Sequence, residues 1–205
     1  MIFEDYEGKY YKGGYQIVAG IDEVGRGCLF GDVVACAIVM PKGEYIEGVN
    51  DSKKLSPKKR EALYDEILKS SVAVGIGRAN AAKIDAVNIK VATHIAMQDA
   101  IENLRDKDGK KVTPDLVLID AETINTKIFQ QSLIKGDEHC YSIACASIVA
   151  KVYRDSLCVR WAEEFPGYGI EKHKGYATKY HREALKHYGP SKMHRMSFLK
   201  NLDKW

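Results

Sequence analysis

Short apolar runs, separated by longer segments, occupy the first half of the chain. Residues 16–22 (QIVAGID), 32–40 (DVVACAIVM) and 72–78 (VAVGIGR) are rich in branched or small apolar side chains. This pattern predicts three β-strands. A fourth run, residues 115–120 (DLVLID), follows Pro114, and its continuous apolar character indicates a strand buried on both faces of a sheet.

Helical periodicity appears between and after these runs. Ser56 and Pro57 form a cap and first-turn pair, which predicts a helix over residues 58–69. Residues 88–105 place apolar side chains at helical spacing on one face. Both segments are long enough to cover a sheet.

The second half of the chain is predicted to be mainly helical. Residues 142–164 form a long predicted helix whose first half is dense in small side chains, which let a helix lie close to a sheet: Ala144, Cys145, Ala146, Ser147 and Ala150. A last helix begins at Thr178 and ends before Gly189 and Pro190. The pattern therefore predicts an α/β domain with a helical C-terminal end.

Size and composition narrow the class of protein. The chain has 205 residues, of which 45% are hydrophobic, which is enough for a core and excludes a disordered chain. We expect residues 1–14 to form an N-terminal tail and residues 15–205 a single domain, with its helical part from about residue 165. No apolar run reaches the roughly 18 residues of a membrane span. The acidic N-terminus lacks a signal-peptide pattern, so we expect a cytoplasmic location.

The cysteines and the charge distribution add two expectations. Five cysteines, odd in number and without a C-x-x-C pair, indicate buried reduced thiols rather than a zinc site or a disulfide framework: Cys28, Cys36, Cys140, Cys145 and Cys158. The net charge is only +3, but the segment from Lys172 onward mixes basic residues with tyrosines. Such a segment suits phosphate neutralisation and base or sugar stacking, and it equally suits a solvated helical surface.

Acidic residues at the ends of predicted strands are the main candidates for chemistry. Asp22 and Glu23 end the first strand, and because successive strand side chains face opposite ways, they need a bulge, a strand end or a site that spreads around the strand. Asp120 ends the buried run 115–120, which places it at the sheet edge where α/β sites gather. Asp137 lies in a Lys-Gly-Asp turn. Each acid taken alone is also compatible with an ordinary surface, cap or turn residue.

Converging carboxylates would repel one another unless cations neutralise them. A set of ligands that contains only oxygen selects Mg²⁺ or Mn²⁺ over zinc. Two such ions, about 3.5–4 Å apart, suit in-line attack on a phosphodiester, because one activates water and the other stabilises the leaving oxygen.

Six segments together resemble the successive motifs of the ribonuclease HII family. They are GIDEVGRG at 20–27, NDSKKL at 50–55, VLIDA at 117–121, KGD at 135–137, ASIVAKVYRD at 146–155 and HKGY at 173–176. His194 and Arg195, with Ser197 and Phe198, resemble the family's C-terminal signature. The resemblance spans roughly residues 15 to 200 in the family's order.

This resemblance implies a ribonuclease H-like fold, with a mixed five-stranded sheet, flanking helices and a C-terminal helical extension. It implies an endonuclease that cuts the RNA strand of RNA–DNA hybrids and nicks 5′ of ribonucleotides in duplex DNA, leaving a 3′-hydroxyl and a 5′-phosphate. Its substrates would be RNA–DNA hybrid and ribonucleotide-containing DNA duplex, and we expect no membrane partner and a monomer. The family's metal-binding acids correspond to Asp22, Glu23 and Asp120, with Asp137 as the fourth carboxylate.

The resemblance also assigns roles in substrate binding. The family's glycine-arginine-glycine turn corresponds to Gly25, Arg26 and Gly27, where glycines let the backbone approach a ribose and its 2′-hydroxyl. Tyr176 corresponds to a tyrosine that packs on the deoxyribose after the ribonucleotide. The remaining residues resemble phosphate-side contacts: Ser52, Lys53, Lys54, Ser147, Lys151, His173 and Lys174. Cys28 stands where the family usually has proline.

Two other classes of function remain open from the sequence. Another nuclease on the same fold could use clustered acids and Mg²⁺ without reading an RNA-to-DNA junction. A non-catalytic hybrid-binding protein is the third reading, although concentrated carboxylates facing phosphates would only weaken such binding.

Overall fold

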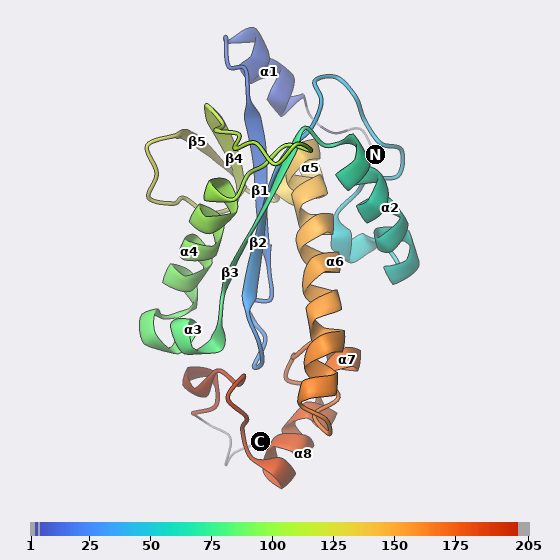
Figure 1. Ribbon diagram of the computed structural model, residues 1–205, viewed down its shortest axis with the longest axis vertical. Coiled ribbons are helices and arrows are strands. Elements are labelled where there is room, and N and C mark those ends of the chain that lie inside the picture. Colours follow the sequence, from blue (N-terminus) through green and yellow to red (C-terminus); the bar gives the residue numbers. More distant parts are fainter. Residues whose placement is uncertain (1–2, 4, 201–205) are drawn as a thin grey trace.

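A mixed five-stranded sheet forms the centre of the computed structural model, which describes residue 3 and residues 5–200 (Figure 1). The strand order is β3-β2-β1-β4-β5, with β1–β2 and β2–β3 antiparallel and β1–β4 and β4–β5 parallel. The strands are β1 (Val18–Val24), β2 (Val33–Val39), β3 (Ala73–Ala79), β4 (Leu116–Asp120) and β5 (Phe129–Leu133).

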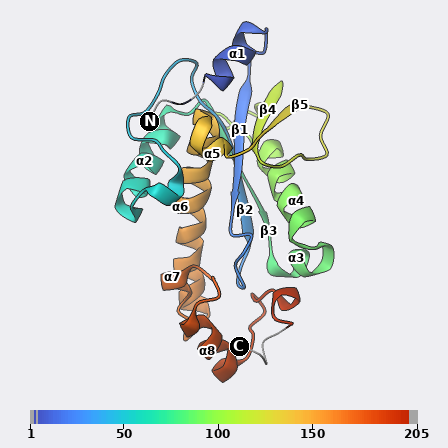
Figure 2. The same ribbon diagram turned by 180° about the vertical axis from the view of Figure 1, so that it is seen from behind.

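Helices cover both faces of this sheet (Figures 1 and 2). Helices α3 (Ala81–Val87) and α4 (Ile89–Glu102) lie on one face, and α2 (Pro57–Ser70) and the long α6 (Tyr141–Glu164) lie on the other. The fold class expected from the sequence is therefore confirmed.

Small side chains allow the long helices to approach the sheet closely. Gly20 on β1 lies against the backbone of Ser142 on α6, and Gly77 on β3 lies against the backbone of Ala96 on α4. A Cβ atom at either glycine would collide with main chain, which cannot move aside as a side chain could. The small residues predicted to pack in the first half of α6 are all buried.

The C-terminal part packs around the far end of α6, at the bottom of Figure 1. It contains α7 (Ile170–His173), α8 (Lys179–Tyr188) and the 3₁₀ turn η2 (Met196–Phe198). Phe30 and Trp161 join it to the sheet and to α6 within one apolar cluster. This packing brings segments near residues 30, 175 and 195 together.

Several elements lie outside the sequence predictions. Helix α1 (Tyr6–Lys12) forms within the predicted tail, and α3, α5 (Gly136–His139), the 3₁₀ turn η1 (Ser52–Lys54) and β5 were not predicted from the pattern. All five cysteines are buried and free, as predicted. Within residues 5–200, no helix is long and apolar enough to cross a membrane.

Candidate active site

The two adjacent acids at the end of β1 point to opposite faces of the sheet. Asp22 pairs with Cys36 and Glu23 with Ala35 in an unbroken antiparallel ladder, so no bulge rotates either side chain. Cys36 belongs to the apolar cluster under α6 and Ala35 to the cluster under α4. Of the three arrangements considered from the sequence, the structure has acids distributed around the strand.

Burial and mutual repulsion destabilise the charged forms of these acids. Burial raises the pKa of Asp22 well above its ordinary value, and the carboxylates of Glu23 and Asp120 raise it further. Burial also raises the pKa of Glu23, although Arg26 opposes this effect. The pKa of Asp120 is raised by burial and then by Asp137. The four predicted acids therefore form one electrostatic group, despite coming from β1, β4 and α5.

The protein's own donors already contact most of this group. Arg26 Nη1 lies 3.2 Å from Glu23 Oε1, and Lys53 Nζ lies 3.0 Å from Asp137 Oδ2. The Gly136 amide donates to Asp120 Oδ1 at 2.7 Å. In the described part of the chain, no three His, Cys, Asp or Glu side chains are grouped as a metal site. Ion binding by all four acids would therefore require the basic side chains to move away.

The donor set nevertheless fits a hard divalent cation. Glu23 Oε2 is buried and has no hydrogen-bond partner among the described residues, which is costly for a carboxylate oxygen. A cation would satisfy this oxygen and relieve the repulsion that raises the pKa of Asp22. All ligands would be oxygens, which matches Mg²⁺ or Mn²⁺.

A small cavity of about 90 Å³ connects the acids with predicted substrate contacts. Its lining consists of Asp22, Glu23, Val24, Ser52, Lys53, Ser147, Lys151 and Tyr176. The Ser52 and Ser147 hydroxyls share a hydrogen bond of 2.9 Å, which joins η1 to α6 at the cavity wall. The other predicted residues lie outside this lining: Gly25, Arg26, Gly27, Lys54, Asp120, Asp137, His173 and Lys174.

The glycine-arginine-glycine turn lies beside this cavity. Gly25 has a φ of +90°, and a Cβ atom there would collide with the Arg154 side chain, so glycine is required. Arg26 Nη1 also lies 2.9 Å from Glu122 Oε1, and Glu122 Oε2 lies 3.0 Å from His94 Nε2. The guanidinium of Arg26 is thus held by two carboxylates rather than left free for a phosphate.

Sequence reasoning missed Glu122 and His94. The signal for Glu122 was its position two residues after Asp120, at the same sheet edge. His94 gave no signal, because it lies within an amphipathic helix and only the fold brings it to Glu122.

Left-handed backbone is concentrated next to the predicted site. Among the described residues, four other than glycine have positive φ, and three of them adjoin or belong to site turns: Ala121, Lys135 and Lys174. Ala121 follows Asp120, and Lys135 precedes the turn that carries Asp137. Such conformations are costly for residues with a Cβ and are found preferentially at functional sites.

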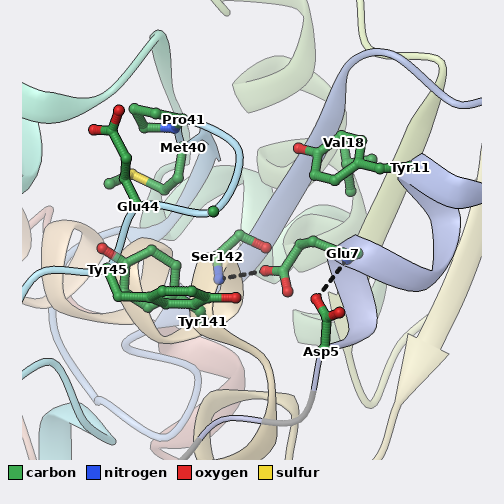
Figure 3. Close-up of a pocket in the computed structure, with 12 residues that line it drawn as sticks. Asp5, Glu7, Tyr11, Val18, Met40, Pro41, Glu44, Tyr45, Tyr141 and Ser142 are labelled. Atoms are coloured by element: carbon green, nitrogen blue, oxygen red, sulfur yellow. Dashed lines mark hydrogen bonds between the residues drawn. The ribbon is translucent and has the colours of Figure 1, made fainter.

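A second cavity, of about 260 Å³, lies at the opposite end of β1 (Figure 3). Glu7 on α1 accepts a hydrogen bond there from the Ser142 amide at 2.8 Å. None of the predicted site residues lines this cavity. The acids, the predicted substrate residues and the strained turns all gather at the other end of the strand.

Comparisons with known proteins agree with the motifs. The family model described as ribonuclease HII matches residues 19–201. The chain is 57% identical over 198 residues to a ribonuclease HII of Alkaliphilus oremlandii (strain OhILAs), covering 97% of this chain and 98% of that protein. The ribonuclease HII of Archaeoglobus fulgidus, solved with PCNA, is 27% identical with a TM-score of 0.73 and covers 93% of this chain and 100% of its own. The ribonuclease H2 of Pyrococcus horikoshii OT3, at 22% identity and a TM-score of 0.74, covers 92% of this chain and 98% of its own and shows the same fold.

Proposed function

The chain belongs to the ribonuclease HII family of endoribonucleases that act on RNA–DNA hybrids, and we propose that it nicks on the 5′ side of single ribonucleotides embedded in duplex DNA. The products would be a 3′-hydroxyl and a 5′-phosphate. Such cleavage would support removal of misincorporated ribonucleotides and of RNA primers.

One observation carries this proposal: carboxylates, cations and an aromatic ring line the same cavity. Asp22 and Glu23 share it with Lys53, Lys151 and Tyr176. A protein that only binds nucleic acid gains nothing from buried acids facing phosphates. Acids beside cationic and aromatic contacts suit a nuclease that holds divalent ions against the phosphate to be cut.

Asp22, Glu23 and Asp120, joined by Asp137, would hold the divalent ions. When bound, these ions supply activation of the attacking water and stabilisation of the leaving oxygen. The Lys53 ammonium contacts Asp137, and because the Lys53 side chain is 77% exposed, it could turn towards a substrate phosphate. Its ammonium would thereby exchange one anionic partner for another.

Two elements would distinguish RNA from DNA. At the Gly25–Gly27 turn, the missing side chains would let the backbone meet the ribose 2′-hydroxyl. Tyr176 is 44% exposed at the cavity, and a Cβ atom on Gly27 would lie only 3.9 Å from its ring. We infer that the ring would pack on the neighbouring sugar, where a deoxyribose would fit and a 2′-hydroxyl would clash.

The remaining predicted residues would hold the backbone of the duplex. Lys54 lies 3.0 Å from Glu138 in an exposed ion pair, and Lys151 lies 2.8 Å from Asp155 in a part-buried one, and a phosphate would replace the carboxylate partner of each ammonium group. His173 Nε2 donates to the Tyr168 carbonyl at 2.8 Å, and Lys174 Nζ donates to the Glu171 carbonyl at 2.7 Å. We propose that His173 and Lys174 stabilise the turn that carries Tyr176 and also contact the substrate.

The test is cleavage of an end-labelled DNA duplex with one ribonucleotide, beside an all-RNA–DNA hybrid, in Mg²⁺, Mn²⁺ or chelator. We expect a metal-dependent nick 5′ of the lone ribonucleotide. Cleavage of the hybrid alone would retain the metal site and remove the junction reading. Binding of both substrates without any cleavage would instead support the non-catalytic reading.

A further inference from the structure

The two elements assigned to sugar recognition come from distant parts of the chain, yet they are joined by direct contacts. The Leu29 amide donates to the Gly175 carbonyl at 2.8 Å, and the Cys28 thiol donates to the Lys174 carbonyl at 3.4 Å. The turn at residues 25–27 and the turn at residues 173–176 are therefore adjacent segments of one surface.

Arg195 holds the first of these turns through hydrogen bonds to its backbone. Its side chain is fully buried, and it donates from Nη1 to the Arg26 carbonyl at 2.8 Å and from Nε to the Gly31 carbonyl at 2.9 Å. Its own amide donates to the Leu29 carbonyl at 2.8 Å. One buried residue thus holds both ends of the segment that begins at the glycine-arginine-glycine turn.

Arg154, on α6, joins the same segment to the second turn. It is also fully buried, and it donates from Nη1 to the Lys174 carbonyl at 2.8 Å and from Nη2 to the Phe30 carbonyl at 3.0 Å. Its Nε donates to the Asp32 carbonyl at 2.9 Å. The planar guanidinium suits this task because its donors point in several fixed directions at once.

A pair of histidines continues the connection to Tyr176. The Tyr176 carbonyl accepts from His181 Nδ1 at 2.9 Å, and the Ser191 amide donates to His194 Nδ1 at 2.9 Å. These contacts require His194 Nε2 to donate to His181 Nε2, which lies 3.1 Å away, with both rings neutral. Since His194 precedes Arg195, this chain of hydrogen bonds connects Tyr176 to the turn at Arg26.

We propose that Arg154 and Arg195 are positioning residues that set the spacing between the Gly25–Gly27 turn and Tyr176, and thereby the preference for an RNA-to-DNA junction. This inference rests on the proposed function of the two elements. A lone ribonucleotide must satisfy both elements at once, with its ribose at the turn and the next deoxyribose on the ring. A fixed spacing would keep the Tyr176 ring against the second sugar, so that a 2′-hydroxyl on that sugar clashes and a deoxyribose does not.

The test is a double-mutant cycle of Arg195→Lys and Tyr176→Ala, with kcat/KM measured on the lone-ribonucleotide duplex and on the all-RNA–DNA hybrid. Lysine keeps the charge but cannot donate to the Arg26 and Gly31 carbonyls in two fixed directions. We expect Arg195→Lys to lower the preference for the lone ribonucleotide about tenfold while hybrid cleavage changes less than about threefold. The double mutant should show no lower preference than Tyr176→Ala alone, because both changes remove the same contact between the Tyr176 ring and the deoxyribose.

Arg105→Lys is the control for the loss of an arginine that donates to two carbonyls at an exposed position. Arg105 also donates to two carbonyls, those of Glu102 and Leu104, at 2.8 and 2.9 Å, but it lies outside the site. We expect its preference to equal that of the wild type. If Arg195→Lys does not fold, Arg154→Lys tests the same spacing from the side of Lys174.

Equal losses on both substrates, or additive losses of preference in the cycle, would overturn the inference while leaving the proposed function intact. Unfolding of both arginine variants would also overturn it, because the arginines would then serve the fold as a whole. Failure of the wild type to nick the lone-ribonucleotide duplex would refute the proposed junction reading, and this inference with it.

Discussion

At the scale of single residues, the chemistry depends on charges that the fold holds in unfavourable surroundings. Asp22 is buried beside Glu23, and both burial and this neighbour raise its pKa. Replacement of Asp22 by asparagine keeps an oxygen that can accept from the Glu23 amide, now 2.7 Å from Asp22 Oδ1. It removes the negative charge and replaces the second carboxylate oxygen with an NH2 group.

We therefore expect Asp22→Asn to lower cleavage by at least about 1000-fold, since a metal-binding charge is lost. Its free energy of unfolding should stay equal to that of the wild type or rise by about 1 kcal/mol, because a buried repulsion is removed. Urea titration and the cleavage assay measure the two quantities. Asp115→Asn is the control, because Asp115 also accepts from backbone amides but lies at the opposite end of β4. Turnover near the wild-type rate in Asp22→Asn would refute the metal-site assignment.

Tyr176 offers the second test at this scale. Because its ring is 44% exposed, truncation to alanine should change the unfolding free energy little. We expect Tyr176→Ala to lower kcat/KM on a lone ribonucleotide about tenfold more than on a long hybrid. Tyr45→Ala removes a similarly exposed tyrosine, 57% exposed and beside the cavity at the opposite end of β1, and should leave the ratio unchanged. Equal losses on both substrates for Tyr176→Ala would remove its role in junction reading.

At the scale of elements, the sequence predicted those whose patterns are strong. The predicted strands and the four predicted helices agree with the structure to within a few residues at their ends. Strand β5 was missed because its sequence, FQQSL, is polar at its centre and only partly buried at the sheet edge, so it lacks apolar alternation. Helix α3 was missed because its seven residues, AAKIDAV, span two turns and give little periodicity.

The site residues, like the elements, could be predicted only where the sequence has a clear pattern. The four acids and the glycine turn stood out because each interrupts or ends a recognisable pattern. The contacts of Arg154 and Arg195 could not be predicted, because they end on backbone carbonyls, most of them more than 100 residues away, as with Asp32 and Arg26. Backbone carbonyls have no residue identity, so no pattern of residue types marks them.

The packing of α8 against the C-terminal segment should depend on pH. Burial lowers the pKa of His181 and of His194 to about 4, from an ordinary value near 6.5. The folded state therefore favours neutral rings, and the stability they contribute is present above pH 6.5 and is lost as the pH falls from about 6.5 towards 4. His173 stacks on His181 and opposes its protonation further.

We expect the free energy of unfolding to fall over this range, by up to about 3 kcal/mol for each ring. Urea titrations between pH 7 and 4 measure the change. His194→Gln should flatten the pH dependence, whereas His187→Gln, at an exposed position on α8, should not. A dependence that is the same in His194→Gln and in the wild type would show that other groups cause it.

At the scale of the whole molecule, the proposed metal-binding residues and the proposed sugar-recognition residues come from different parts of the fold. The ends of β1 and β4 and the start of α5 supply the acids, while the C-terminal part supplies Tyr176 and the buried arginine beneath the glycine turn. The net charge of +3 does not reveal the cluster of acids, because basic side chains of the same molecule contact these acids and offset their charge. Ion binding must therefore compete with internal partners.

This competition leads to a prediction about metal binding without nucleic acid. Divalent ions that bind only the folded state stabilise it by mass action, by about 2.7 kcal/mol at a hundredfold excess over Kd. We expect Mg²⁺ or Mn²⁺ to raise Tm by several degrees, and the rise to disappear in chelator and in Asp22→Asn. Lys53 and Lys54 provide a matched comparison, since each ammonium lies 3.0 Å from a carboxylate, but Lys53 contacts Asp137 and Lys54 contacts Glu138.

Lys53→Met should therefore strengthen ion binding, because it frees Asp137 of its competing cation, whereas Lys54→Met should not. The measurement is the metal concentration at half of the Tm shift, which we expect to fall about threefold in Lys53→Met. The same variant should cleave more slowly, because Lys53 would otherwise contact a phosphate. Equal metal affinities in the two lysine variants would mean that Asp137 does not bind the ion before substrate arrives. The three acids Asp22, Glu23 and Asp120 would then be the ligands of the free enzyme.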